Sequence, residues 1–119
     1  NKALTVEISY LREESEEVSI TRINIGDLYM KLKKFNLASD YYLSAIIHHK
    51  TGGFLYRLGN CYLELNKHEI ALDYYIQSAE IRNHDIGLDN EATQESISNA
   101  KRLAKELNKE SELPEWMKL

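Results

Sequence analysis

The segment from 25 to 42, IGDLYMKLKKFNLASDYY, returns 33 residues later, at 58 to 75, as LGNCYLELNKHEIALDYY. From 26 to 42, eight of the seventeen aligned pairs are identical, and three of the others, Leu28 with Cys61, Met30 with Leu63 and Leu37 with Ile70, exchange one apolar residue for another. A fixed period in this range is typical of stacked supersecondary units, none of which buries its apolar face alone. The repetition therefore predicts two copies of one structural unit in the middle of the chain.

Each copy has the apolar spacing of two helices. In the first copy the apolar positions of the two helical faces are Ile25, Leu28, Tyr29 and Leu32, then Leu37, Tyr41, Tyr42 and Ala45. A short polar turn at 33–36 lies between them, and Asn36 is expected to cap the second helix. Gly52 and Gly53 are expected to stop the first unit, because glycine ends helices readily. We therefore predict a helix–turn–helix twice and no β-sheet.

These residues resemble the tetratricopeptide repeat, whose pattern pairs a glycine and a following tyrosine with a later alanine and aromatic residue. The matching residues are Ile25, Gly26, Tyr29, Ala38 and Tyr42 in the first copy and Leu58, Gly59, Tyr62, Ala71 and Tyr75 in the second. The resemblance covers 19–84 and implies an all-α solenoid of stacked antiparallel helix pairs. It also implies that each glycine lies against the small alanine of its own unit. The family's tryptophan position holds Arg22 and Leu55 instead.

The flanks complete one predicted domain over 1–119. The expected parts are an N-terminal helix within 1–18, repeats at 19–51 and 52–84, a linker and capping helix at 85–110, and a tail at 111–119. The N-terminal helix could belong to a degenerate upstream repeat. The capping helix, expected over 91–108 after a linker at 83–90 and a cap at Asp89 or Asn90, has this apolar stripe: Ala92, Ile97, Ala100, Ala104 and Leu107. A helix with a polar outer face after the last repeat would close the solenoid.

The last seven residues hold four large apolar side chains, Leu113, Trp116, Met117 and Leu119. Left free in water, such a segment would be an unusual apolar exposure. We therefore predict that the tail folds back into an apolar groove of its own or of a neighbouring copy. The alternative is a frayed terminus, which is the default for chain ends.

Composition excludes several classes of function. The net charge of −4 argues against nucleic acid, because a phosphate-binding surface normally needs a basic excess. No apolar run approaches the length of a membrane span, and no signal-peptide pattern opens the chain. Cys61 is the single cysteine, so no disulfide can close within the chain. This favours a reducing compartment, and we expect a cytoplasmic protein that binds neither membrane nor nucleic acid.

The sequence offers no catalytic or metal-binding constellation. The four histidines, His48, His49, His68 and His84, lie at predicted helix ends or turns, and no pair has the spacing of a metal site on a helix. Cys61 is expected inside a helix pair as a small buried hydrophobic residue, with no activating histidine near it in sequence. We therefore expect no enzyme, no metal and no cofactor.

The resemblance supplies the expected function. In this family the first helix of each unit lines a concave face that binds an extended or helical peptide. Carried over by position, this groove comprises Ile20, Ile23, Asn24, Asp27, Met30 and Lys31 in the first unit and Tyr56, Arg57, Asn60, Leu63 and Glu64 in the second. The set mixes apolar anchors with hydrogen-bonding groups, as a peptide groove should. The chain is expected to bind another protein or a peptide as an adaptor or scaffold.

Two alternatives stay open. One is a self-associating assembly or chaperone-type domain, in which a homodimer covers exposed repeat faces. The other is a regulatory segment of a larger protein.

The carboxylate clamp known in the family is not expected: Asn24 and Arg57 fall on two of its positions, but Gly53 stands where a lysine belongs. A carboxylate needs several converging cations, and at the clamp's positions this groove offers one, Arg57.

Overall fold

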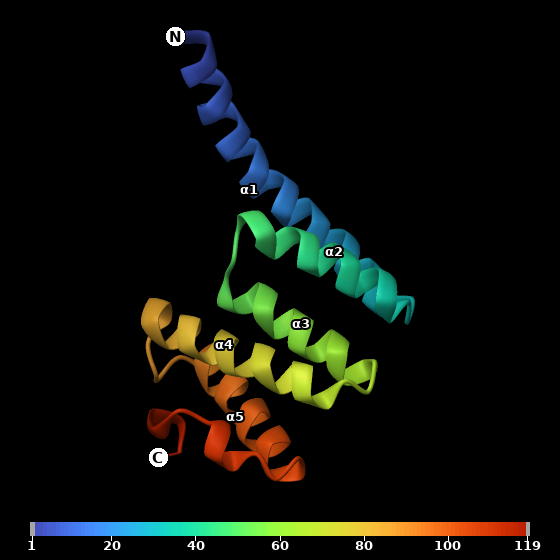
Figure 1. The fold of residues 1–119 in the computed structure, drawn as a ribbon, viewed down its shortest axis with the longest axis vertical. Helices are drawn as coiled ribbons and strands as arrows, with labels where there is room; N and C mark the ends of the chain where they lie inside the picture. The colour runs from blue at the N-terminus through green and yellow to red at the C-terminus, as the bar shows by residue number, and fades with distance from the viewer. Residues whose placement is uncertain (1, 119) are drawn as a thin grey trace. The chain divides into compact units, whose positions relative to one another are not determined.

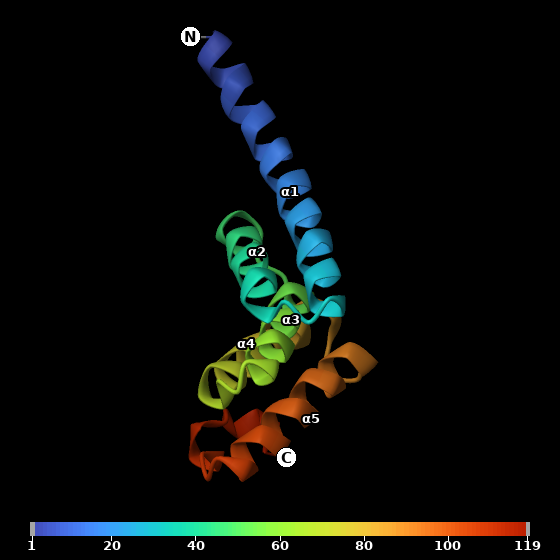
Figure 2. The same cartoon turned by 90° about the vertical axis from the view of Figure 1, so that its right-hand side faces the viewer.

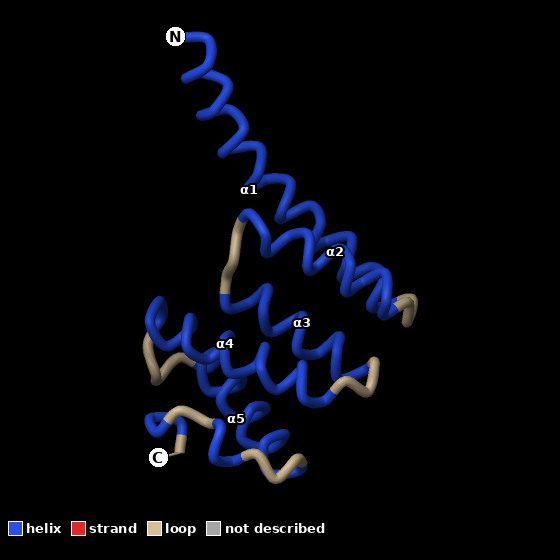
Figure 3. The backbone as a smooth tube through the Cα atoms, in the orientation of Figure 1, coloured by secondary structure: helices blue, strands red, loops and turns tan. Residues whose placement is uncertain are grey.

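The computed structural model describes the backbone of residues 2–118 and the side chains of residues 16–118. The chain forms two compact units, 1–50 and 51–119, each with its own helix packing. Across residues 2–118 the backbone is made of helices, turns and loops without a strand (Figure 3). The predicted all-α class is confirmed.

The first unit is a helix pair. Helix α1 (Lys2–Lys31) packs along α2 (Phe35–His48), and the two run side by side in opposite directions (Figure 1). Helix α1 continues well past the end of α2 in both views (Figures 1 and 2). Its backbone is one continuous helix through residues 18 and 19.

The core of this first unit lies between the two helices and contains Ile23, Ala38, Tyr42 and Ala45. Next to it, the buried Ser19 hydroxyl donates a hydrogen bond of 2.9 Å to the Ala45 carbonyl. This bond satisfies a hydroxyl that burial would otherwise leave without a partner. A small residue at 19 thereby lets the two backbones approach at the far end of the pair.

The second unit contains α3 (Gly52–Glu64), α4 (His68–Ile86) and α5 (Glu91–Glu106), followed by two short 3₁₀ turns, η1 (Glu110–Glu112) and η2 (Glu115–Met117). Helix α4 packs against both α3 and α5. Three helices and the tail therefore share one core in this unit.

The turns inside the two helix pairs have the same geometry. Lys33 and Asn66 both adopt a left-handed backbone with φ of 59°. The next residue in each turn donates its N–H back to a tyrosine carbonyl, Lys34 to Tyr29 and Lys67 to Tyr62, both at 2.9 Å. This is the Schellman arrangement, which satisfies the last carbonyls of the first helix. Lys34 is therefore the N-cap residue of α2, and its side chain makes no capping hydrogen bond. Asn36 lies inside the helix, so the prediction that it caps α2 is wrong.

Gly52 and Gly53 open a helix and do not stop one, contrary to the expectation from sequence. Thr51 is the cap of α3, and its hydroxyl oxygen accepts the N–H of Phe54 at 3.1 Å. Gly52 sits where a β-carbon would lie 2.5 Å from Cγ of Arg82, so the position has no room for a larger residue. Helix α2 of the first unit ends before them, at His48. The glycine that follows the end of a helix is Gly87, after α4, and its φ of 88° suits glycine. Helix α4 runs through Ile86, and the expected linker at 83–90 shrinks accordingly.

Helix α5 begins as predicted from a cap at Asn90, whose side chain accepts the N–H of Ala92 at 2.9 Å. Its buried face comprises Thr93, Ser96, Ile97, Ala100, Leu103 and Ala104, while Ala92 and Leu107 are only half-buried. The prediction missed Thr93, Ser96 and Leu103, and for Ser96 the reason is that its hydroxyl is buried against partners from α4. Ser96 and Ser78 share a hydrogen bond of 2.9 Å, and Arg82 donates to Ser96 at 2.7 Å.

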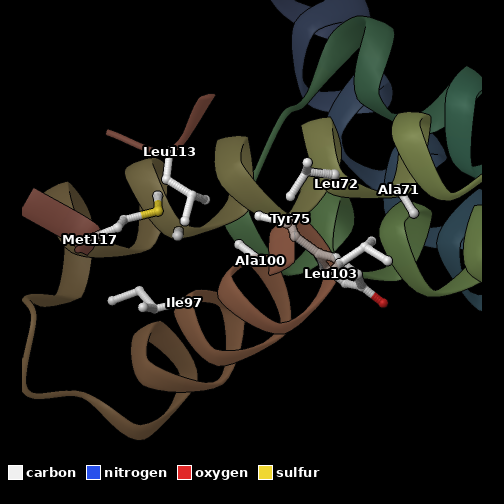
Figure 4. Packing of buried hydrophobic residues seen from close by; sticks show 10 residues of the cluster. Ala71, Leu72, Tyr75, Ile97, Ala100, Leu103, Leu113 and Met117 are labelled. Atoms are coloured by element: carbon white, nitrogen blue, oxygen red, sulfur yellow. The ribbon is translucent and has the colours of Figure 1, made fainter. Parts of the chain in front are cut away.

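The tail docks on its own unit. Leu113 and Met117 belong to the same buried cluster as Tyr75, Ile97 and residues of α4 and α5 (Figure 4). Met117 is 1% exposed, whereas Trp116 is half-buried at the edge of the cluster. The tail thus folds back as predicted, but methionine and leucine, rather than tryptophan, fill the core. Leu119 lies outside the described residues.

Candidate functional site

The two units share one packing contact, between a glycine of the first helix and a tyrosine of the second. A β-carbon on Gly59 would lie 2.6 Å from the Tyr75 ring, and one on Gly26 would lie 2.5 Å from the Tyr42 ring. The glycines therefore make room for the tyrosines, which are buried. Ala38 and Ala71, the alanines expected opposite these glycines, are each fully buried one helical turn before the tyrosine.

Each buried tyrosine donates its hydroxyl hydrogen to the residue that follows the glycine in the first helix. Tyr75 bonds Oδ1 of Asn60 at 2.6 Å, and Tyr42 bonds Oδ1 of Asp27. Both acceptors were predicted as groove residues. One side-chain oxygen of each acceptor is engaged in this intramolecular hydrogen bond. The bond holds the tyrosine hydroxyl at the surface of the first helix.

In the second unit, α5 completes the face that α3 presents. The Tyr56 hydroxyl donates to Oε1 of Glu95 at 2.6 Å and accepts from Nδ2 of Asn99 at 2.7 Å. The Arg82 guanidinium lies over the Tyr56 ring, 4.8 Å from its centroid. Tyr56 thereby joins all three helices, with its ring half-buried and its hydroxyl at the surface between α3 and α5.

Charged and hydrogen-bonding groups gather at this surface, which we call the α3–α5 face. Its residues are Tyr56, Asn60, Glu64, Glu95, Asn99 and Arg102. Burial raises the pKa of Tyr75 to about 12; Arg102 opposes this shift, while Glu64 and Glu95 add to it. Burial, followed by the hydrogen bond with Glu95, raises the pKa of Tyr56 to about 12 as well. The two phenols therefore stay neutral at ordinary pH, and they serve as hydrogen-bonding groups.

The structure distributes the remaining predicted groove residues unevenly. In the first unit Ile20, Asn24 and Lys31 are exposed and Met30 is half-buried, whereas Ile23 is 3% exposed and belongs to the core. In the second unit Glu64 is exposed, and the others are half-buried, as follows: Tyr56, Arg57, Asn60 and Leu63. Arg57 donates to the Gly53 carbonyl of its own helix at 3.4 Å, and Leu63 packs against the core cluster.

Three residues of the α3–α5 face were not predicted: Glu95, Asn99 and Arg102. They are spaced four and three residues apart, which puts them on one side of a helix. This spacing was visible in the sequence. What the sequence did not show is that this side of α5 lies beside α3, because α5 lacks the repeat motif.

Within residues 16–118, no three His, Cys, Asp or Glu side chains gather closely enough to hold a metal ion. Cys61 is a buried thiol in α3, as predicted. Among the described helices, none is long and apolar enough to cross a membrane.

Repeated helix pairs, built on a glycine–tyrosine contact and presenting their first helices at the surface, define a helical repeat protein. A tetratricopeptide repeat family profile matches residues 21–46 and 53–85. The chain belongs to the tetratricopeptide repeat family. Tetratricopeptide repeats are generally protein–protein interaction modules and are typically not enzymes. No curated protein and no solved structure matches the chain significantly.

Proposed function

We propose that this chain binds a peptide segment of another protein along the first helices of its repeats, and so acts as an adaptor or scaffold. The α3–α5 face carries this proposal. There a half-buried aromatic ring, Tyr56, lies among hydrogen-bonding and charged groups such as Asn60, Glu64 and Arg102. Interface hot spots are commonly aromatic or arginine side chains within a polar rim.

The face suits a peptide because its own groups are held in place. Tyr56 is fixed by Glu95 and Asn99, and Asn60 is fixed by Tyr75. Side chains that are already ordered lose less conformational entropy when a ligand binds. Glu64 and Arg102 bring opposite charges to the same face, so a ligand with both an acidic and a basic side chain would be favoured.

The first unit presents a corresponding set of residues on its own first helix. Ile20, Asn24, Met30 and Lys31 provide apolar and polar groups on α1, whereas the buried Ile23 supports them from the core. Asp27 accepts from Tyr42 and positions the surface of α1 as Asn60 does in α3. The proposed groove residues on α1 are therefore mainly the exposed members of the predicted set.

Selection of ligands from a random peptide display library, followed by NMR titration of the full chain, tests this proposal. We expect selected peptides to shift the amide signals of Asn60, Glu64 and Asn99, and Glu64→Arg to weaken binding about tenfold or more. The matched control is Glu80→Arg, which changes an exposed glutamate on α4. Peptides that shift α4 signals and respond to Glu80→Arg alone would refute binding at the α3–α5 face.

Self-association is the second candidate, and apolar exposure in the first unit favours it. Ile47 is 74% exposed, and Leu28, Leu32 and Leu37 are also exposed. A homodimer that covers such side chains would remove apolar surface from water. Sedimentation equilibrium distinguishes the candidates: a monomer at high micromolar concentration excludes the dimer, and a dimer that Ile47→Glu dissociates supports it.

We place this activity in the cytoplasm. The support is Cys61, the single cysteine, which is a buried thiol. A chain built without disulfides suits a reducing compartment. Localisation of the tagged full-length gene product to an oxidising compartment would contradict this assignment.

A further inference from the structure

A cavity of about 410 Å³ lies in the second unit, between residues of α5 and residues of the tail. The tail folds back beside α5 in both ribbon views (Figures 1 and 2). The lining of the cavity comprises Lys101, Arg102, Lys105, Glu110, Leu113 and Lys118. Four of these side chains are cationic, and Glu110 is the one carboxylate among the lining residues described. This local excess of positive charge contrasts with the chain's net charge of −4.

Lys101 and Lys105 have little structural role that would explain their position in the cavity. Lys101 and Lys105 are four residues apart on α5, a spacing at which like charges disfavour a helix slightly. The helix dipole stabilises cations only in the last turn, which accounts for Lys105 but not for Lys101. Nearby Lys109, by contrast, pairs with Glu69 at 3.5 Å and with Glu112 at 3.7 Å. Among residues 16–118, neither Lys101 nor Lys105 forms such a pair.

The docked tail makes the cavity a defined site. Leu113 is 6% exposed and belongs to the buried cluster with residues of α4 and α5, so the part of the tail that lines the cavity is anchored in the core. Lys118 is held by an ion pair of 2.9 Å with Glu115. A ligand would thus meet flexible lysines from α5 opposite a fixed segment of the tail.

We propose that this cavity binds an acidic, extended segment of another protein, with Lys101 and Lys105 each pairing with one carboxylate. Lysines one helical turn apart are separated by roughly 6 Å. Alternate side chains of an extended peptide point the same way, about 6.6 Å apart. Acidic residues at positions i and i+2 therefore match the two lysines, whereas residues at i and i+1 point to opposite sides. The proposal does not depend on binding at the α3–α5 face.

Two capped peptides of the same composition test the proposal. One has the sequence Ala-Glu-Ala-Glu-Ala and the other Ala-Glu-Glu-Ala-Ala, each titrated into the full chain. The fluorescence of Trp116, the single tryptophan, reports on the adjacent tail. We expect the alternating peptide to bind several-fold more tightly than its isomer, and the binding to weaken as salt is raised.

The double variant Lys101→Gln/Lys105→Gln should weaken binding of the alternating peptide about tenfold or more, because it removes two charge-assisted contacts. Lys34→Gln/Lys50→Gln is the matched control, since it removes two exposed lysines from the first unit. Circular dichroism of each variant establishes that it is folded. Equal binding of both peptides, or an equal loss in the two double variants, would overturn the proposal. Competition by inorganic phosphate at the peptide's own concentration would also overturn it, because it would indicate a general anion site.

Discussion

The two helix pairs share one contact and differ in what surrounds it. In both, a tyrosine of the second helix packs against a glycine of the first and bonds the next residue, Asp27 or Asn60. In the second pair, however, the tyrosine also belongs to a cluster that α5 and the tail enlarge. The repeat motif therefore specifies the geometry of a pair, whereas non-repeating segments determine how much core that pair shares.

The largest expected effect on stability is at Tyr75, the tyrosine of the second pair. Tyr75→Ala should lower the free energy of unfolding by about 3–5 kcal/mol, because it leaves a cavity in the core and removes a hydrogen bond. Tyr74→Ala is the control, since Tyr74 is half-buried and stacks on Tyr62 near the surface. Urea denaturation of both variants checks the comparison. An equal loss in the two variants would show that the cluster is not centred on Tyr75.

The tail should matter next. Met117→Ala should lower the free energy of unfolding by about 2–3 kcal/mol, because Met117 is almost fully buried against α4 and α5. Trp116→Ala should cost less, since the indole lies at the edge of the cluster. Thermal unfolding monitored by circular dichroism measures both. A greater loss for Trp116→Ala would reverse our account of how the tail is anchored.

Two glycine-to-alanine substitutions separate the cost of a steric clash from the gain in helix propensity. Gly59→Ala should cost about 1–2 kcal/mol, because the new methyl group would overlap the Tyr75 ring. Gly53→Ala should stabilise the chain by about 0.5–1 kcal/mol, since its β-carbon would have only an ordinary contact with Arg57 at 3.5 Å. Chemical denaturation of the two variants decides whether the glycine–tyrosine contact or propensity dominates. Stabilisation by Gly59→Ala would contradict the packing described here.

Alkaline pH should weaken the second unit. The pKa values of Tyr56 and Tyr75 are raised from 10.0 to about 12 in the folded chain. Both phenols therefore ionise more readily in the unfolded chain, so their contribution to stability is complete below pH 10 and is lost between pH 10 and about 12. The slope of stability with pH in this window should become shallower in Tyr56→Phe and Tyr75→Phe. An unchanged slope in both variants would assign the dependence to other groups.

The smallest expected effect lies in the turns. Lys33 and Asn66 have the same left-handed backbone, which asparagine tolerates better than lysine. Lys33→Asn should stabilise the first unit by about 0.5–1 kcal/mol, and Asn66→Lys should destabilise the second by a similar amount. Thermal unfolding measures the pair of changes. If both substitutions shifted the unfolding temperature in the same direction, the left-handed turn conformation would not be the cause of the stability changes.

Local patterns predicted those parts of the fold in which the chain repeats itself. The 33-residue period, the helical spacing and the glycine–tyrosine motif predicted both helix pairs and the all-α class. Errors occurred at helix ends, where the relevant signals compete. Gly52 and Gly53 resemble a helix stop, yet Thr51 caps a helix that begins at Gly52. Asn36 resembles a cap, yet the Schellman turn at Lys33 already fixes where α2 begins.

The candidate sites were predicted less completely. Position in the motif indicated Tyr56, Asn60 and Glu64, but not that Glu95 and Asn99 of α5 would bond Tyr56. It also included Ile23, which is buried in the core, because the motif assigns a position on the helix and not its exposure. The basic cavity beside the tail escaped notice for a related reason. Its lining joins α5 to Lys118, and the cations are interleaved with glutamates along the sequence.

The repeat unit, the family and the apolar character of the tail follow from residue types at fixed spacing along the chain. The side of α5 that faces α3, the tail residue that fills the core and the place where unpaired lysines converge depend on how the helices pack in three dimensions. Periodicity describes one helix at a time. The partners of a side chain depend on how several helices pack, and that packing is a balance of burial and hydrogen bonding over the whole unit.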